Sequence, residues 1–193
     1  MLRFSLVAVF FSIACLAQAQ DATPLRVVPD AAPAISVVEQ AFDDWTYRCQ
    51  LGADGALAGC EVSQRVFVEL DGGLAEVLKL AIAPADDQAG KVDDALIVRA
   101  LGDVHLASDF GLQFGSRKPF KTRYRNCNTL GCWVVMPADR KLISGMKQAA
   151  DGSARFRLLN GQVLKVVFSL AGFTRAYAAF ASGDVPTANE VQQ

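Results

Sequence analysis

Between about residue 38 and residue 181, the apolar positions fall in short runs rich in Val, Ile, Phe and Leu, separated by Gly, Asp and Asn. Such runs with turn residues between them are typical of the strands of a β-sandwich or barrel. We predict strands over residues 42–50, 59–70, 75–83, 95–101, 104–107, 112–114, 120–127, 132–136, 154–159 and 163–170. Asn160-Gly161 predicts a tight hairpin between the last two, because both residues tolerate the positive φ of a primed turn.

Two segments follow a helical period instead. Residues 138–149 carry apolar side chains at helical spacing after Asp139, a residue type that suits an N-cap. Residues 173–180 place apolar residues at i, i+3, i+4 and i+7, which gives one apolar face. The pattern as a whole predicts an all-β fold with one or two short helices.

The N-terminus has the layout of a secretory signal peptide. An apolar stretch, 4–16, follows Met1-Leu2-Arg3 and precedes Ala17-Gln18-Ala19, whose small residues suit signal peptidase. We expect a signal peptide over 1–19, a flexible leader over 20–37, the β-sandwich domain over 38–181 and a flexible tail over 182–193. An uncleaved anchor, or a lipid carried on Cys15, are the alternatives, although the apolar stretch is short for a membrane span.

Charge and length narrow the classes of function. The formal net charge of the 193-residue chain is −1, and this near balance argues against a nucleic-acid binder, which usually carries a clear basic excess. The mature chain is expected to contain no transmembrane segment. The remaining length suits one domain with one core.

Four cysteines remain after the signal, in two close pairs. Cys49 and Cys60 flank a turn that contains Asp54-Gly55, and Cys127 and Cys132 flank a second turn. Three pairings are formally open, and we favour the two local disulfides, each stabilising by roughly 2–3 kcal/mol in the chain-entropy model. Zinc usually requires closer spacing within each ligand pair. A redox dithiol at Cys127 and Cys132 stays open, although such pairs usually have two intervening residues at a helix N-terminus.

Candidate catalytic groups are few. His105 is the one histidine, and its alternation with Val104 and Leu106 places it on the outer face of a predicted strand rather than in a Ser/His/Asp arrangement. Nucleophile-elbow, zinc-protease and phosphate-loop motifs are absent from the sequence. The acidic pairs Asp43-Asp44, Asp86-Asp87 and Asp93-Asp94 lack the spacing of a calcium-loop motif. We therefore predict no catalytic residue, no metal and no cofactor.

One cluster of charge is a candidate binding site. On a strand, Lys121, Arg123 and Arg125 would share one face, opposite Phe120, Thr122 and Tyr124. Such a ridge could contact lipid phosphates, acidic glycans or an acidic protein. A solvated strand, or an edge protected from aggregation by charge, is the alternative.

Several landmarks in order resemble the invasion-associated locus B family of exported alphaproteobacterial proteins. They are Phe42-Asp43-Asp44-Trp45, then Cys49, Cys60, Cys127-Asn128-Thr129-Leu130-Gly131-Cys132 and Ser169-Leu170-Ala171-Gly172-Phe173. The resemblance covers about residues 40–180 and implies an immunoglobulin-like β-sandwich. It implies no catalytic residues. It also implies core positions for Phe42 and Trp45 and a turn at Gly172.

These observations lead to a hypothesis about function. We expect an exported, non-enzymatic protein, periplasmic, outer-membrane associated or secreted, that acts by surface binding. Its partner would be an envelope component or a host-surface protein or glycan, contacted through Lys121, Arg123 and Arg125. The alternatives are a periplasmic enzyme, a thiol-redox protein that uses Cys127 and Cys132, and a small-ligand carrier.

Overall fold

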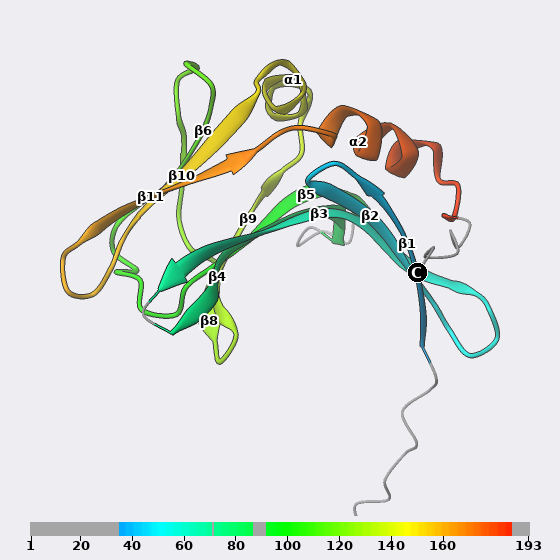
Figure 1. The fold of residues 1–193 in the computed structure, drawn as a ribbon, viewed down its shortest axis with the longest axis horizontal. Helices are drawn as coiled ribbons and strands as arrows, with labels where there is room; N and C mark the ends of the chain where they lie inside the picture. The colour runs from blue at the N-terminus through cyan, green and yellow to red at the C-terminus, as the bar shows by residue number, and fades with distance from the viewer. Residues whose placement is uncertain (1–34, 71, 87–91, 187–193) are drawn as a thin grey trace, which may run out of the picture. The chain divides into compact units, whose positions relative to one another are not determined.

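The structure is a computed structural model, and it describes residues 35–70, 72–86 and 92–186. The predicted signal peptide, most of the predicted leader and the last part of the predicted tail lie outside the described residues. Two antiparallel β-sheets and two helices make up the described part of the chain (Figure 1). This arrangement confirms the predicted all-β sandwich with short helices.

The larger sheet has the strand order β1-β2-β3-β4-β5-β9-β8. Its first five strands are a meander, in which each strand pairs with the next in the sequence. Alternating apolar residues on one face and polar residues on the other explain why these segments form half-buried strands. Their bounds are β1 Ser36–Phe42, β2 Trp45–Leu51, β3 Leu57–Leu70, β4 Gly73–Asp86, β5 Val92–Ala100, β8 Asn126–Asn128 and β9 Gly131–Pro137.

The smaller sheet has the strand order β11-β10-β6-β7. Its strands are β6 Phe110–Phe114, β7 Phe120–Thr122, β10 Asp151–Arg157 and β11 Val163–Ser169. In β10, buried Ala154 and Phe156 alternate with exposed Arg155 and Arg157. The small sheet therefore has an apolar inner face and a cationic outer face.

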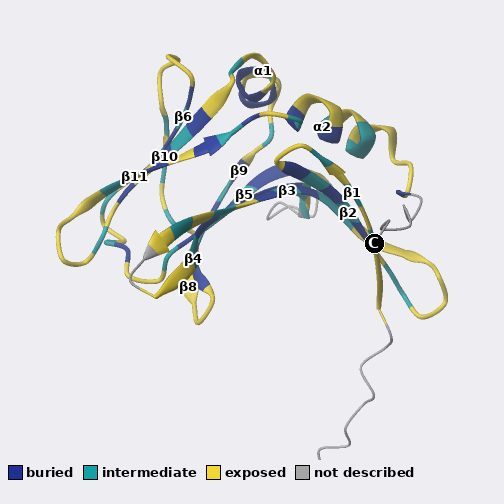
Figure 2. Ribbon diagram, viewed as in Figure 1, coloured by how far each residue is buried: buried dark blue, intermediate teal, exposed yellow. Residues whose placement is uncertain are grey.

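The core lies between the inner faces of the two sheets and beneath the helices (Figure 2). Helix α1, Arg140–Gln148, begins after Asp139, whose carboxylate accepts a hydrogen bond of 2.8 Å from the backbone N–H of Leu142. Helix α2, Phe173–Ser182, buries Phe173 and Ala176. Both helices occur where the helical periods predict them.

Trp45 connects the large sheet to α2. Its side chain is fully buried, its ring packs edge-on against Phe173 with centroids 4.9 Å apart, and its Nε1 donates a 3.1 Å hydrogen bond to the Ser169 carbonyl. Gly172 allows the chain before α2 to lie close to the backbone of Phe42, because its φ is 83° and a Cβ there would overlap the Phe42 carbonyl. Truncation of such a buried indole should cost about 3–5 kcal/mol.

Both local disulfides form. Cys49 and Cys60 lie directly opposite each other on β2 and β3, and Cys127 and Cys132 do the same on β8 and β9. Each therefore closes a hairpin, as the turn residues between the paired cysteines predict.

Three predicted strands are broken or absent in the structure, and β1, Ser36–Phe42, was not predicted as a strand. Residues 120–127 are not one strand, because the chain leaves the small sheet after Thr122 and enters the large sheet at Asn126. Tyr124 packs against Phe110 at this crossing, with ring centroids 6.1 Å apart, and burial raises the pKa of its phenol to about 12. The predicted strand over 104–107 is also wrong, since only Val104 forms a β-bridge there. The predicted strand over 42–50 is interrupted at Asp43, whose φ is 51°.

Candidate functional site

The outer face of the small sheet carries two adjoining hollows. One has a volume of about 430 Å³ and the other about 340 Å³, and they share Gly111, Lys121 and Arg155 as lining residues. We call this surface the basic groove. The cationic residues that line it are Lys121, Arg123, Arg155, Arg157 and Lys165.

Strand register explains why these cations meet. Arg155 on β10 lies directly opposite Lys165 on β11 and, on its other side, opposite Gly111 on β6. Gly111 in turn lies opposite Lys121 on β7. Paired residues share a face of a sheet, so one row across four strands reads Lys, Arg, Gly, Lys.

Gly111 leaves the floor of this row open. A Cβ at that position would lie 3.6 Å from the Arg155 carbonyl oxygen and 3.7 Å from the Arg155 Cβ, which is ordinary van der Waals contact. The backbone does not require glycine there. Its effect is to leave space between the side chains of Arg155 and Lys121.

The groove is poor in compensating charge. Asp109 pairs with Arg123 at 3.2 Å, and the Arg123 guanidinium also donates to the Ala107 carbonyl. Within the described ranges, no carboxylate lies at ion-pair distance from Lys121, Arg155, Arg157 or Lys165. Lysine and arginine side chains held together without carboxylates have their donors free for an anionic ligand.

The structure separates the predicted basic ridge into two parts. Lys121 and Arg123 line the groove, whereas Arg125 lines neither hollow and its backbone N–H donates to the Trp133 carbonyl of β9 at 2.7 Å. Sequence reasoning missed Arg155, Arg157 and Lys165. The alternation in 154–159 is a signal that would place Arg155 and Arg157 on one face of a strand, but nothing in the sequence aligns them with Lys121.

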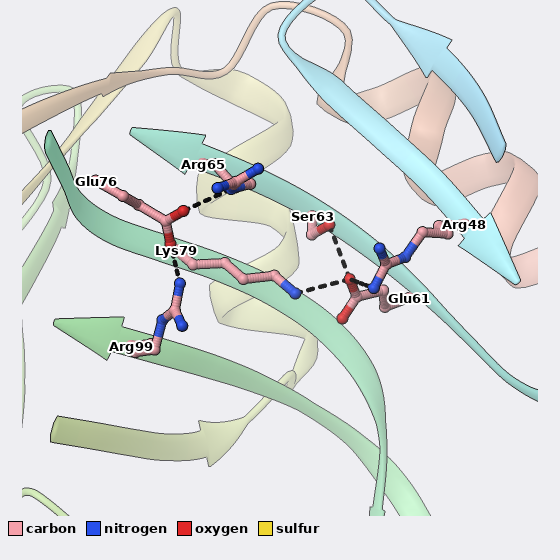
Figure 3. A network of polar contacts seen from close by, with 7 residues as sticks. All are labelled: Arg48, Glu61, Ser63, Arg65, Glu76, Lys79 and Arg99. Carbon is pink, nitrogen blue, oxygen red and sulfur yellow. Dashed lines mark hydrogen bonds and ion pairs between the residues drawn. The ribbon is translucent and has the colours of Figure 1, made fainter. Parts of the chain in front are cut away.

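The outer face of the large sheet carries a second charged cluster, which we call the charged ladder (Figure 3). Its members are Arg48, Glu61, Ser63, Arg65, Glu76, Lys79 and Arg99. Glu61 Oε1 accepts from Lys79 at 2.8 Å and from Ser63 at 3.1 Å and lies 3.4 Å from Arg48. Glu61 therefore pairs with two cations of the ladder, Arg48 and Lys79.

Glu76 is the second acid of the ladder. It pairs with Arg65 at 2.5 Å and also accepts a hydrogen bond from Arg99. Burial opposes ionisation of this carboxyl, but the hydrogen bonds and charges of the two arginines outweigh it and lower its pKa. Glu76 is thus held as a carboxylate between two cations.

His105 forms no catalytic triad. Its Nδ1 lies 2.9 Å from the Ser108 hydroxyl within a four-residue turn closed by a hydrogen bond from the Ser108 N–H to the His105 carbonyl. No carboxylate of the described residues hydrogen bonds to the His105 ring, and the adjacent Asp109 pairs with Arg123 instead. The contact shapes the loop that borders the groove.

The described residues contain no group of three or more His, Cys, Asp or Glu that could hold a metal ion. In these ranges, neither helix has the length and apolar character needed to cross a bilayer.

Comparisons with known proteins identify relatives. The sequence model of the family described as "Invasion associated locus B (IalB) protein" matches residues 45–181. The crystal structure of invasion associated protein B from Bartonella henselae superposes with a TM-score of 0.59 at 15% identity, covering 75% of this chain and 96% of that one. No curated protein matches the chain. The structural likeness supports the sandwich fold.

Proposed function

The chain belongs to the invasion associated locus B (IalB) family, and from this premise we propose that it is an exported, non-enzymatic protein that binds clustered anionic groups in its basic groove. The observation that carries the proposal is the row Lys165, Arg155 and Lys121 on the small sheet, from which every carboxylate of the described residues lies beyond ion-pair distance. Phosphate and sulphate groups are the ligand chemistry that such donors prefer.

The cost of keeping these cations together supports a binding role. Like charges directly opposite each other on neighbouring strands destabilise a sheet. Arg155 and Lys165 are such a pair, and both side chains are exposed. An anionic ligand bound between the two side chains would reduce this repulsion. The repulsion therefore favours binding of an anion at this position.

Export fits the cysteine chemistry. The disulfides Cys49–Cys60 and Cys127–Cys132 suit an oxidising compartment such as the periplasm or the cell exterior. We place the protein there, with an envelope component or a host-surface protein or glycan as its partner. The sequence pattern of residues 1–19 supports the same location.

A charge-reversal experiment tests the groove. Arg155→Glu with Lys165→Glu should weaken binding of a sulphated hexasaccharide, measured by calorimetry at low salt, by about a hundredfold, because two charge-assisted contacts are lost. Binding by the native protein should weaken as salt is added.

The matched control is Arg125→Glu with Arg140→Glu, which changes the net charge equally but lies outside both hollows. It should retain most of the affinity. Equal loss in the two double variants would mean that net charge alone governs binding. That result would contradict the groove as the site.

A further inference from the structure

Exposed leucines border the basic groove at one end of the small sheet. Leu106 is 54% exposed and directly precedes Ala107, which lines the larger hollow. Leu159 is 66% exposed and follows Arg157, another lining residue, by two positions. Two turns that border the hollow therefore each present a large apolar side chain to solvent.

Backbone hydrogen bonds join these two turns. The Leu159 N–H donates to the Asp103 carbonyl at 2.9 Å, and the His105 N–H donates to the Arg157 carbonyl at 2.8 Å. Val104 also forms a β-bridge with Leu158. The two leucines therefore lie on turns joined by hydrogen bonds, and Arg123, which follows β7, donates a hydrogen bond to the Ala107 carbonyl of the same loop.

A third turn, which belongs to the large sheet, carries another exposed leucine. Leu130, 65% exposed, lies at the tip of the β8–β9 hairpin and lines a hollow together with Leu101 and Gly102. The Sγ of Cys132 on this hairpin contacts the Gly102 carbonyl at 3.5 Å. Leu106, Leu130 and Leu159 therefore project from three turns that are connected to one another through residues 101–104.

Single exposed leucines are common on protein surfaces and need no explanation. Leucines on neighbouring turns beside unpaired cations are a different case, because peripheral membrane binding combines burial of apolar side chains with attraction to anionic lipids. A soluble glycan would use the cations and leave the leucines in water. The combination favours a lipid surface.

We propose that this end of the protein docks onto an anionic lipid bilayer, with lipid phosphates in the basic groove and Leu106, Leu130 and Leu159 in the interface between headgroups and acyl chains. This inference rests on the proposed function, since it uses the same groove. It adds the leucines as a second determinant that a soluble anion does not need.

The test compares two probes. Leu106→Ser with Leu159→Ser should lower partitioning onto phosphatidylglycerol–phosphatidylcholine vesicles, measured by flotation, by about tenfold, because two side chains no longer enter the interface. The same variant should bind the sulphated hexasaccharide as the native protein does. Leu57→Ser, which alters a 51% exposed leucine at the start of β3, is the control and should change neither.

Unchanged vesicle binding by the double leucine variant would overturn the inference. Hexasaccharide binding without vesicle binding by the native protein would also overturn it, while leaving the proposed function standing. Failure to bind either probe would contradict both. As a second measurement, the tryptophan fluorescence that Leu159→Trp adds to that of the native protein should shift to shorter wavelength when vesicles are added. Absence of that shift would count against insertion.

Discussion

The two sheets each carry a row of cations across their outer face, and the rows differ in one respect. On the large sheet, Arg65, Lys79 and Arg99 lie opposite one another on β3, β4 and β5. On the small sheet, Lys165, Arg155 and Lys121 form the corresponding row, with Gly111 between the last two. The cations of the first row are paired with glutamates. No described carboxylate lies at ion-pair distance from the second row, because the nearby Asp109 pairs with Arg123.

This difference distinguishes cations that are already paired within the protein from cations that are free to bind a ligand. Glu61 and Glu76 neutralise the ladder, so its arginines and lysine are already engaged and contribute to holding β2 to β5 together. Apart from Arg123, which is engaged by Asp109 and the Ala107 carbonyl, the groove cations retain their hydrogen-bonding capacity. A basic cluster in a sequence is therefore informative about binding only once its pairing is known.

Among substitutions of charged residues, removal of the ladder glutamates should produce the largest change in stability. Glu61→Gln with Glu76→Gln leaves three cations in a row uncompensated, and we expect a loss of about 2 kcal/mol in the free energy of unfolding. Arg155→Ala with Lys165→Ala should change it by no more than about 0.5 kcal/mol. Urea unfolding of the two double variants measures the contrast, and equal destabilisation would contradict it.

A smaller effect is expected from pH. The pKa of Glu76 is lowered in the folded protein from its ordinary value of 4.5, so its contribution to stability is fully present above that value. It should disappear as the pH falls through the lower, folded-state pKa. The stability difference between the native protein and Glu76→Gln should therefore be constant near neutrality and shrink below about pH 4.5. A difference that persists at pH 2 would argue against the carboxylate as its source.

The smallest effect on stability should come from placing a carboxylate among the cations of the groove. Ser153 lies two residues before Arg155 on β10 and lines the same hollow as Lys165. Ser153→Glu should stabilise the protein by a few tenths of a kcal/mol through new cross-strand pairs, while weakening hexasaccharide binding. Ser153→Gln is the control of similar size. If both variants bind as the native protein does, the unpaired state of the groove has no bearing on binding.

Local signals in the sequence accounted for much of the fold. The paired cysteines and the turn residues between them predicted two hairpins, and helical periods predicted α1 and α2. The crossing between the sheets was missed because apolar and cationic residues alternate without a break from Phe120 to Arg125, although the strand ends at Thr122. Alternation reports which side of the chain is buried, not which sheet buries it.

The groove was harder to predict because it depends on register. A two-residue turn at Asn160-Gly161 would place Arg155 opposite Val166, whereas the observed hairpin places it opposite Lys165. Its loop is longer, with the Leu158 N–H bonded to the Gln162 carbonyl at 2.8 Å. Pairing of β10 with β6, more than 35 residues earlier in the chain, then adds Lys121 to the row. Such long-range pairing leaves no local trace in the sequence.

The most direct measurement is an NMR titration of the isotopically labelled protein with the sulphated hexasaccharide. Amide signals of Gly111, Lys121, Arg155 and Lys165 should shift together and saturate with one dissociation constant, while those of Glu61 and Glu76 on the ladder stay in place. Saturating shifts centred on the ladder, or shifts spread evenly over both sheets, would contradict the assignment of binding to the unpaired cations of the small sheet.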